Sequence, residues 1–254
     1  MRKIIFLFIS VLIPLFFLSC AKAPYTGRTQ IMMVSPQQEI QMGYQAAREI
    51  LKKEKISRDP RLNALVRRVG MRIARVANQP DYKWEFFVID KDILNAFCLP
   101  GGKVFVYKGI LKAAQNEDQL ATVIAHEVAH AIARHGAERV SMMQLGQLGK
   151  QLVSELLLKG SSYAPLFDLA YGVGAEYGVI LPYSRKFEYE ADEIGLYLMT
   201  KAGYDPREAI KFWENMIRLK KGGNIPEFLS THPADENRIA RLKQLIPKAL
   251  KYYR

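Results

Sequence analysis

A pair of histidines restricts both the local fold and the chemistry of this chain. Residues 126–130 read HEVAH, within the longer apolar stretch ATVIAHEVAHAIARHG. Each residue of an α-helix turns by about 100°, so positions four apart lie on one face. A helix over this segment therefore aims His126 and His130 at one point, while Glu127 is displaced by one position. Histidines placed in this way can share a metal ion, and the glutamate can reach water bound to that ion.

The plain alternative is an ordinary helix that carries two histidines by chance. Three of the four histidines of the chain fall in this segment, whose flanks are apolar. A buried pair without a metal needs two separate hydrogen-bond solutions, so the pattern favours a metal site. His135 lies about half a turn around the helix from His126, which excludes it as a ligand of the same ion. We expect His135 in the last helical turn, before Gly136 as the stop signal.

A catalytic zinc ion needs a third protein ligand and an open position for water. The segment SRKFEYEADEIG, residues 184–195, supplies the candidates. Glu188 and Asp192 are four positions apart on one predicted helix face, and Glu190 points the opposite way. This spacing favours Glu188 as the ligand and Asp192 as an acceptor for a ligand histidine N–H. Glu190 competes as a ligand by its charge, and an exposed acidic helix without a metal is the plain alternative.

Two further stretches accompany HEVAH and the pattern R-x-x-E-x-E-A-D-x-x-G at residues 185–195. They are NAFCLPGGKVFVYKG, residues 95–109, and STHPADENRI, residues 230–239. Together the four motifs resemble the HtpX-like and CaaX prenyl endopeptidase group of zinc metalloproteases, metallopeptidase family 48. The resemblance covers roughly residues 35–245, and Cys98 is a conservative departure from the family's alanine. The short chain is most similar to the periplasmic lipoprotein branch of that family.

The resemblance implies a zinc metalloendopeptidase with one Zn²⁺ ion per chain. His126, His130 and Glu188 would hold the zinc, and Glu127 would be the general base. Glu127 would take a proton from the attacking water and pass it to the leaving amine. A structural zinc site has no use for such a glutamate, which favours a protease over a purely structural site.

Three more residues receive roles from the same resemblance. Asp192 would orient a ligand histidine, and His232 would approach the metal or the oxyanion. Arg238 would help to place His232 or the substrate carbonyl. For the last two, the plain alternatives are a capping histidine before Pro233 and a surface arginine.

The remaining pattern predicts an α+β fold that is mostly helical, a zincin-like domain with a small antiparallel sheet and the HExxH motif on its active-site helix. Ser35-Pro36 and Asp59-Pro60 are N-caps followed by proline, and Asn116 with Gln119 forms a capping-box pattern. Later helices are expected over 184–202, from Pro206 to Gly222, and from about Pro233.

A strand is expected over residues 84–89, and two more on either side of Pro100-Gly101-Gly102. The strand Lys103–Tyr107 is predicted to bind the substrate backbone as an added strand. The predicted substrate-side residues are Asn95, Gly101, Gly102 and Val104. The Leu-rich segment 141–182 is interpreted as core, with a lid over the cleft as the alternative.

The N-terminus predicts export. MRK followed by the apolar stretch from Ile4 to Leu18 is a secretory signal layout. Ser19-Cys20 then resembles a bacterial lipoprotein processing site, which implies lipidation of Cys20. An uncleaved N-terminal anchor is the alternative. The predicted organisation is a signal peptide (1–19), a tether with little structure (20–34) and a zinc metalloprotease domain (35–254). The length of 254 residues fits one such domain.

Charge and context narrow the expected partners. The net charge of +12 has no accompanying nucleic-acid motif, so we expect no nucleic acid. The basic excess suits either anionic lipid headgroups or a solvated surface. Ala21 after Cys20 favours the periplasmic face of the outer membrane in lipoproteins of this type. The expected substrates are unfolded or misfolded envelope proteins, in protein quality control. The alternative is a chaperone-like outer-membrane assembly factor whose zinc site is latent or structural.

Overall fold

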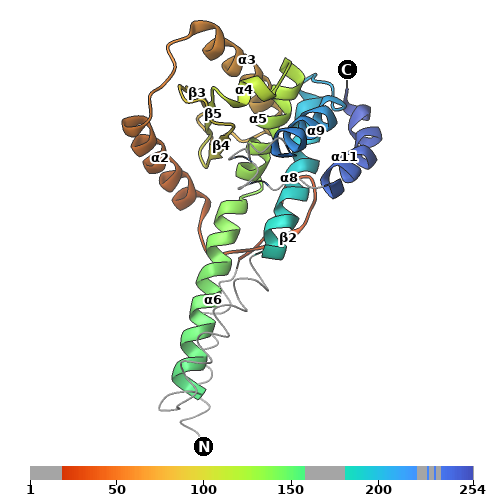
Figure 1. Cartoon of the computed structure of the whole chain (residues 1–254). Helices are drawn as coiled ribbons and strands as arrows, with labels where there is room; N and C mark the ends of the chain where they lie inside the picture. Colours follow the sequence, from red (N-terminus) through yellow and green to blue (C-terminus); the bar gives the residue numbers. More distant parts are fainter. Residues whose placement is uncertain (1–18, 158–180, 222–227, 229–231, 233–235, 254) are drawn as a thin grey trace, which may run out of the picture.

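The computed structural model of the chain describes residues 19–157, 181–221, 228, 232 and 236–253 (Figure 1). The predicted fold class is confirmed, because the described chain is mostly helical and carries a small sheet. Among these residues, no helix is both long enough and apolar enough to cross a membrane.

The two N-terminal helices begin where the sequence predicts. Helix α2 (Pro36–Lys53) starts after Ser35, whose side chain accepts a hydrogen bond from the backbone N–H of Gln38. The Gln38 side chain in turn accepts from the Ser35 backbone, which completes a capping box. Helix α3 (Pro60–Ala77) is capped by Asp59, whose side chain accepts from the backbone N–H groups of Arg61 and Leu62. Each cap contributes about 1 kcal/mol to helix stability.

The main sheet has three strands: β3 (Glu85–Ile89), β4 (Ala96–Leu99) and β5 (Lys103–Tyr107). Their spatial order is β3-β5-β4. The predicted antiparallel pair is formed by β4 and β5, and β3 adds a parallel pair with β5. The turn between β4 and β5 contains Gly101 and Gly102 with φ of 85° and 86°, a left-handed conformation that favours glycine.

The prediction that Lys103–Tyr107 receives a substrate strand is wrong. β5 is the central strand and is paired on both edges, so its backbone donors and acceptors are already used. Val104, one of the predicted substrate-side residues, is fully buried in that strand. The outer edges of the described sheet belong to β3 and β4, and that of β3 is partly paired through the bridge between Ile56 and Ile89.

Helix α5 (Glu117–Ile132), which carries HEVAH, lies at the centre of the core (Figure 1). Asn116 caps it by accepting from the backbone N–H of Gln119. The Gln119 side chain accepts from Gln115 rather than from Asn116, so only half of the predicted capping box forms. The predicted stop at Gly136 is wrong by a few residues. The helix ends at Ile132, and Arg134 adopts the left-handed conformation with φ of 56°.

The other helices surround α5. They are α4 (Ile110–Ala113), α6 (His135–Leu157), α8 (Leu181–Lys201), α9 (Glu208–Lys221), α11 (Glu236–Ala249) and the 3₁₀ turn η3 (Leu250–Tyr252). Helix α6 runs away from the body as a long projection, and α8 packs along α5 (Figure 1). Gly195 permits a close crossing of α8 over α5, since a Cβ there would lie 3.1 Å from the backbone nitrogen of His126. Gly203, with φ of 81°, follows the end of α8.

The segment expected to be a tether with little structure is folded. β1 (Ser19–Lys22) and β2 (Thr29–Met32) form an antiparallel hairpin, and β2 packs against α6. We call residues 19–32 the N-terminal hairpin. Gln30 is 1% exposed, and its side chain donates to the backbone oxygen of Ala133 at 2.6 Å. These contacts are between residues far apart in sequence, which local patterns do not encode.

Two expectations concern residues that the structure does not describe. The predicted signal peptide, residues 1–19, lies outside the described residues except for Ser19. Of the segment 141–182, residues up to 157 continue α6 and residues 158–180 lie outside the described chain.

Candidate metal centre

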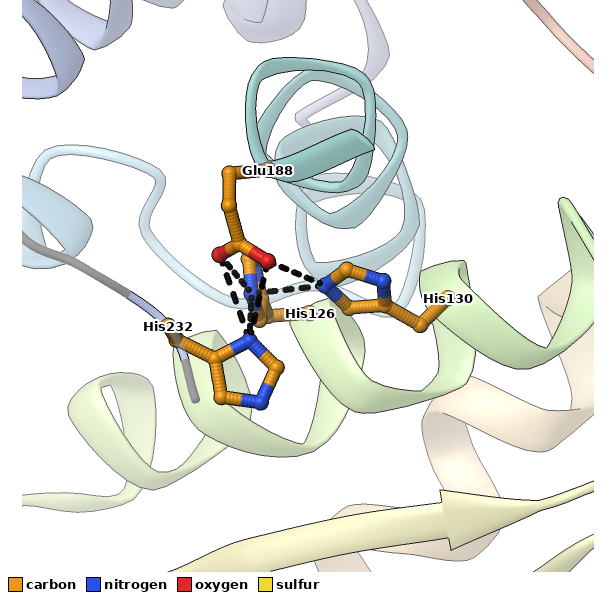
Figure 2. A group of neighbouring side chains, drawn as sticks. All are labelled: His126, His130, Glu188 and His232. Carbon is orange, nitrogen blue, oxygen red and sulfur yellow. Dashed lines mark hydrogen bonds and ion pairs between the residues drawn. The ribbon is translucent and has the colours of Figure 1, made fainter. Parts of the chain in front are cut away.

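Four side chains from three parts of the chain meet at one point (Figure 2). They are His126, His130, Glu188 and His232, and their ligand atoms all lie within 4.8 Å of one another. The two Nε2 atoms of His126 and His130 are 3.1 Å apart. The Glu188 carboxylate lies 3.4 Å from His126 Nε2 and 3.3 Å from His130 Nε2. The structure therefore brings together the three predicted zinc ligands and adds His232 as a fourth possible ligand.

The helices that carry these side chains explain their convergence. On α5 the i, i+4 spacing places His126 and His130 on one face. On α8, Glu188 precedes Gly195 by seven residues, or about two helical turns, so both lie on the face towards α5. The close crossing at Gly195 then brings the Glu188 carboxylate within reach of both rings.

Asp192 contacts the first histidine, the residue that it is predicted to orient. Its Oδ1 lies 3.1 Å from His126 Nδ1, while Nε2 of the same ring faces the ligand group. A histidine that offers Nε2 to a metal must carry its proton on Nδ1, and a carboxylate at that nitrogen fixes this tautomer. Asp192 is 6% exposed, so the contact is shielded from water.

Arg238 is not a surface arginine, because it is 1% exposed. Its Nε and Nη2 donate to the two oxygens of Asp192, each at 2.7 Å. Nη1 lies 3.1 Å from Glu188 Oε2 and 3.5 Å from the backbone oxygen of His232. The guanidinium also stacks on Trp213, 3.8 Å from the ring centre. Of the two predicted roles, these contacts support placing His232 rather than contacting a substrate carbonyl.

His232 lies between the ligand group and the predicted general base. Its Nδ1 is 3.2 Å from Glu188, and its Nε2 is 3.5 Å from Glu127 Oε1. The ring also packs on Phe228 with a centroid distance of 4.6 Å. Both predicted roles, a fourth ligand or an oxyanion contact, are compatible with this position.

Glu127 is buried next to the ligand group, with 3% of its surface exposed. Its Oε1 has no hydrogen-bond partner among the described residues. Burial raises the pKa of this carboxyl above its ordinary value. A buried carboxylate oxygen without a partner is costly, and water or a substrate at the centre would satisfy it. A raised pKa makes this carboxylate a better proton acceptor than an exposed glutamate.

The electrostatics of the group favour a cation. Burial opposes the charged form of His126, but Asp192 and Glu188 outweigh it and raise the pKa of His126 to about 9. Burial likewise opposes the charged form of Glu188, yet the neighbouring histidines hold its pKa well below the usual range. The pKa of His130 is lowered by burial, which keeps it neutral and able to bind a metal.

The donor set identifies the kind of cation that fits. Three imidazoles and one carboxylate are nitrogen and oxygen ligands that suit Zn²⁺, whereas Mg²⁺ and Ca²⁺ prefer oxygen alone. The convergent nitrogens and carboxylate, together with the partnerless oxygen of Glu127, fit a zinc ion with a reactive water. The arrangement of these side chains alone defines the candidate site for such an ion.

Glu190, the competing ligand, points away from the group. Its Oε2 lies 3.0 Å from His135 Nε2, and Arg28 and Thr26 donate to its carboxylate. His135 is not in the last turn of α5 but begins α6, and its Nδ1 lies 2.9 Å from His130 Nδ1. The sequence reasoning missed this contact. His135 and Glu190 are 55 positions apart, so no local pattern indicates that they meet.

The remaining substrate-side residues lie in the β4–β5 region, outside the ligand group. Asn95 is 9% exposed, and its side-chain oxygen accepts from the backbone N–H of Ala96. Gly101 and Gly102 form the turn, where added Cβ atoms would meet Tyr44 and Trp84. These three positions shape the hairpin that carries the edge strand β4.

Comparisons with known proteins agree with this geometry. The model of peptidase family M48 matches residues 60–246. The mitochondrial metalloendopeptidase OMA1 of Schizosaccharomyces pombe is 41% identical over 185 residues, covering 72% of this chain and 53% of the relative. The protein of the same name from Saccharomyces cerevisiae is 34% identical over 260 residues, covering 91% and 70%.

A bacterial relative is the beta-barrel assembly-enhancing protease of Escherichia coli K12. It is 31% identical over 235 residues, covering 89% of this chain and 47% of the relative. The chain thus spans about half the length of the relatives from S. pombe and E. coli.

Proposed function

The chain belongs to peptidase family M48, and from this membership we propose that it is a zinc-dependent endopeptidase of the cell envelope that hydrolyses unfolded or misfolded envelope proteins. The family match and the names of the relatives indicate a metalloendopeptidase. The observation that carries the proposal is the convergence of His126, His130 and Glu188 beside the buried Glu127.

The residues of the centre divide the work of peptide hydrolysis. A zinc ion held here would polarise the scissile carbonyl and lower the pKa of a bound water. Glu127 accepts the proton of the attacking water and returns it to the leaving amine. The partnerless oxygen and the raised pKa of Glu127 support this role. His232, whose Nε2 is 3.5 Å from Glu127 Oε1, is the proposed oxyanion contact.

The edge strand β4 is the proposed place for the substrate backbone. Tyr107 N–H donates to the Asn95 oxygen, so the alternating pattern of an antiparallel pair turns the backbone groups of Ala96 and Cys98 outwards. β4 also packs against α5, next to the ligands. Strand addition reads an extended backbone more than a sequence, which suits unfolded chains as substrates.

The proposed location is the membrane surface, through a lipid anchor at Cys20, on the periplasmic face of the outer membrane. The motif Ser19-Cys20 supports this, and β1 begins at Ser19. A lipid at Cys20 would hold the catalytic domain directly at the headgroups, where the net charge of about +10, which is the +12 of the full sequence without Arg2 and Lys3 of the signal peptide, suits anionic lipids.

A second candidate function is an envelope assembly factor with a latent zinc site. The four-residue group favours it, because four protein ligands leave a tetrahedral zinc ion without a position for water. The E. coli relative is named for enhancing beta-barrel assembly. His232→Phe separates the two roles of this histidine. Faster cleavage would identify His232 as a ligand that closes the site, and slower cleavage would identify it as an oxyanion contact.

The deciding experiment measures zinc content and cleavage of unfolded casein by the full chain in detergent. We expect one zinc per chain and cleavage in the wild type. Glu127→Gln should keep the zinc and lose activity by about 10²–10⁴-fold. Glu188→Ala should lose the zinc, whereas Glu193→Gln, a matched change on the same helix, should alter neither. If the wild type binds zinc but cleaves nothing, and the His232→Phe variant also cleaves nothing, the protease function is refuted.

A further inference from the structure

A chain of buried polar contacts leads away from the second predicted ligand, His130. The Nδ1 atoms of His130 and His135 are 2.9 Å apart, and His135 Nε2 is 3.0 Å from Glu190 Oε2. His135 and Glu190 are 2% and 6% exposed. His135 also stacks on Phe187, with ring centres 4.6 Å apart and planes at 12°. Both contacts are therefore shielded from water and held in one geometry.

The direction of the hydrogen bonds follows from the chemistry of the ligand. His130 Nε2 faces Glu188 and His126, so its lone pair is the one available to a metal. Its proton must then sit on Nδ1 and be donated to Nδ1 of His135. His135 consequently carries its own proton on Nε2, where the Glu190 carboxylate accepts it. The bond to Glu190 fixes the tautomer of His135, and the bond to His135 fixes the tautomer of His130.

Residues of the N-terminal hairpin bind Glu190, the last member of this series of hydrogen bonds. Arg28 Nε donates to Glu190 Oε2 at 2.7 Å, and the Thr26 hydroxyl donates to the other oxygen. The same guanidinium donates to both oxygens of Glu138 on α6, at 2.7 and 2.6 Å. Gln30 adds a bond to Glu138 at 2.8 Å. Arg28 thus bridges Glu138 of α6 and Glu190 of α8, which lie 110 and 162 positions later in the chain.

We propose that His135 and Glu190, held by Arg28 and Thr26 of the N-terminal hairpin, are positioning residues that orient His130 for zinc. The proposal rests on the proposed zinc site and adds a role for residues that touch neither metal nor substrate. The two histidine ligands are then supported differently. His126 is held directly by Asp192 and through it by Arg238, near the C-terminus. His130 is held through two residues by the N-terminal hairpin.

Two substitutions of one residue separate positioning from packing. His135→Asn replaces Nδ1 by an amide oxygen that can accept from His130, but it loses the stack on Phe187. His135→Phe keeps an aromatic ring for that stack and removes the acceptor. We expect His135→Phe to bind zinc about 10–100-fold more weakly than the wild type, the usual effect of removing such a partner. His135→Asn should lie close to the wild type.

The readouts are the zinc dissociation constant in a chelator competition and the visible absorption of the Co²⁺-loaded full chain. A misoriented His130 should alter the Co²⁺ spectrum of His135→Phe, whereas a packing defect at a distance should not. Arg28→Met should weaken zinc binding in the same direction, with Arg61→Met, an exposed arginine, as the matched control. Should Arg28→Met fail to fold, Thr26→Val removes one bond to Glu190 and tests the same link.

The outcomes distinguish this inference from the proposed function. A wild type that binds no zinc would overturn both. A wild type that binds zinc, with His135→Phe equally tight and spectrally unchanged, would overturn only the positioning role. Weak binding by His135→Asn together with normal binding by His135→Phe would show that the ring matters for packing alone, which also overturns it. Weaker binding by His135→Phe with a changed spectrum and a near-normal His135→Asn supports it.

Discussion

Replacement of Arg238 by methionine tests how the buried charges of the centre are balanced. Arg238 is 1% exposed and contacts two carboxylates, Asp192 and Glu188. Methionine keeps an apolar stem against Trp213 but removes the cation, so both buried carboxylates lose a partner. Removing one member of a buried ion pair costs about 3–5 kcal/mol.

The structure places the expected cost within this range. Asp192 would lose two donors at 2.7 Å and keep only the contact with His126 at 3.1 Å. Glu188 keeps its contacts with the histidines. The surviving contacts compensate in part, so we expect a loss of about 3 kcal/mol in the free energy of unfolding. For a chain of this size, that lowers Tm by about 6–12 °C.

The assay is urea unfolding of the full chain in EDTA, which removes any stabilisation from bound metal. Arg241→Met is the matched control, because Arg241 lies on the same helix, is exposed and stacks on Tyr189. It should cost about 0.5 kcal/mol or less. Adding Asp192→Asn to Arg238→Met should cost less than the sum of the two single changes, since the uncompensated charge is removed. A loss below about 1 kcal/mol for Arg238→Met would refute the view that this arginine holds the site together.

Three further predictions follow from other contacts. Gly43→Ala should lower stability by about 1–3 kcal/mol in a thermal melt, because its Cβ would lie 2.0 Å from the Pro100 oxygen; an unchanged Tm would contradict the packing of α2 on the β4–β5 turn. Hydrogen bonds from Lys211, then from Asn116 and Gln119, lower the pKa of Glu208 in the folded protein. Ionised Glu208 therefore stabilises the fold fully above its pKa in the unfolded chain, and this contribution is lost as the pH falls through its lower pKa in the folded protein. Urea midpoints at pH 7 and pH 3 should therefore differ less for Glu208→Gln than for the wild type, and equal differences would disprove the link. Cys98→Pro should leave the fold intact but slow casein cleavage, since proline removes an outward N–H of an edge strand; unchanged cleavage would place the substrate elsewhere.

The convergence of the candidate metal ligands was predictable in part from the sequence, because helical spacing is a local property. The i, i+4 pairs His126/His130 and Glu188/Asp192 each define one helix face without any knowledge of the partner helix. The caps at Ser35 and Asp59 are equally local, and the structure has both. Predictions of this kind depend only on residues within one or two turns.

The features that were missed depend on residues far apart in sequence. Nothing near Lys103–Tyr107 indicates that β3 pairs with it in parallel, so β5 was predicted as an accessible strand. The N-terminal hairpin has short strands and is stabilised by Arg28 and Gln30, whose partners lie on other elements. His135 was placed by extending α5 through Arg134, which instead adopts a left-handed conformation and redirects the chain.

The wide spacing of the four ligand residues affects the order of events during synthesis. His126 and His232 are 106 positions apart, and Arg238, which fixes Asp192 and Glu188, comes later still. Contacts of such separation form late, because the intervening chain must first be ordered. A nascent chain that has emerged only as far as α5 presents two histidines and no carboxylate of the set. The four residues of the candidate metal centre can therefore come together with Arg238 only after the chain has been made as far as residue 238.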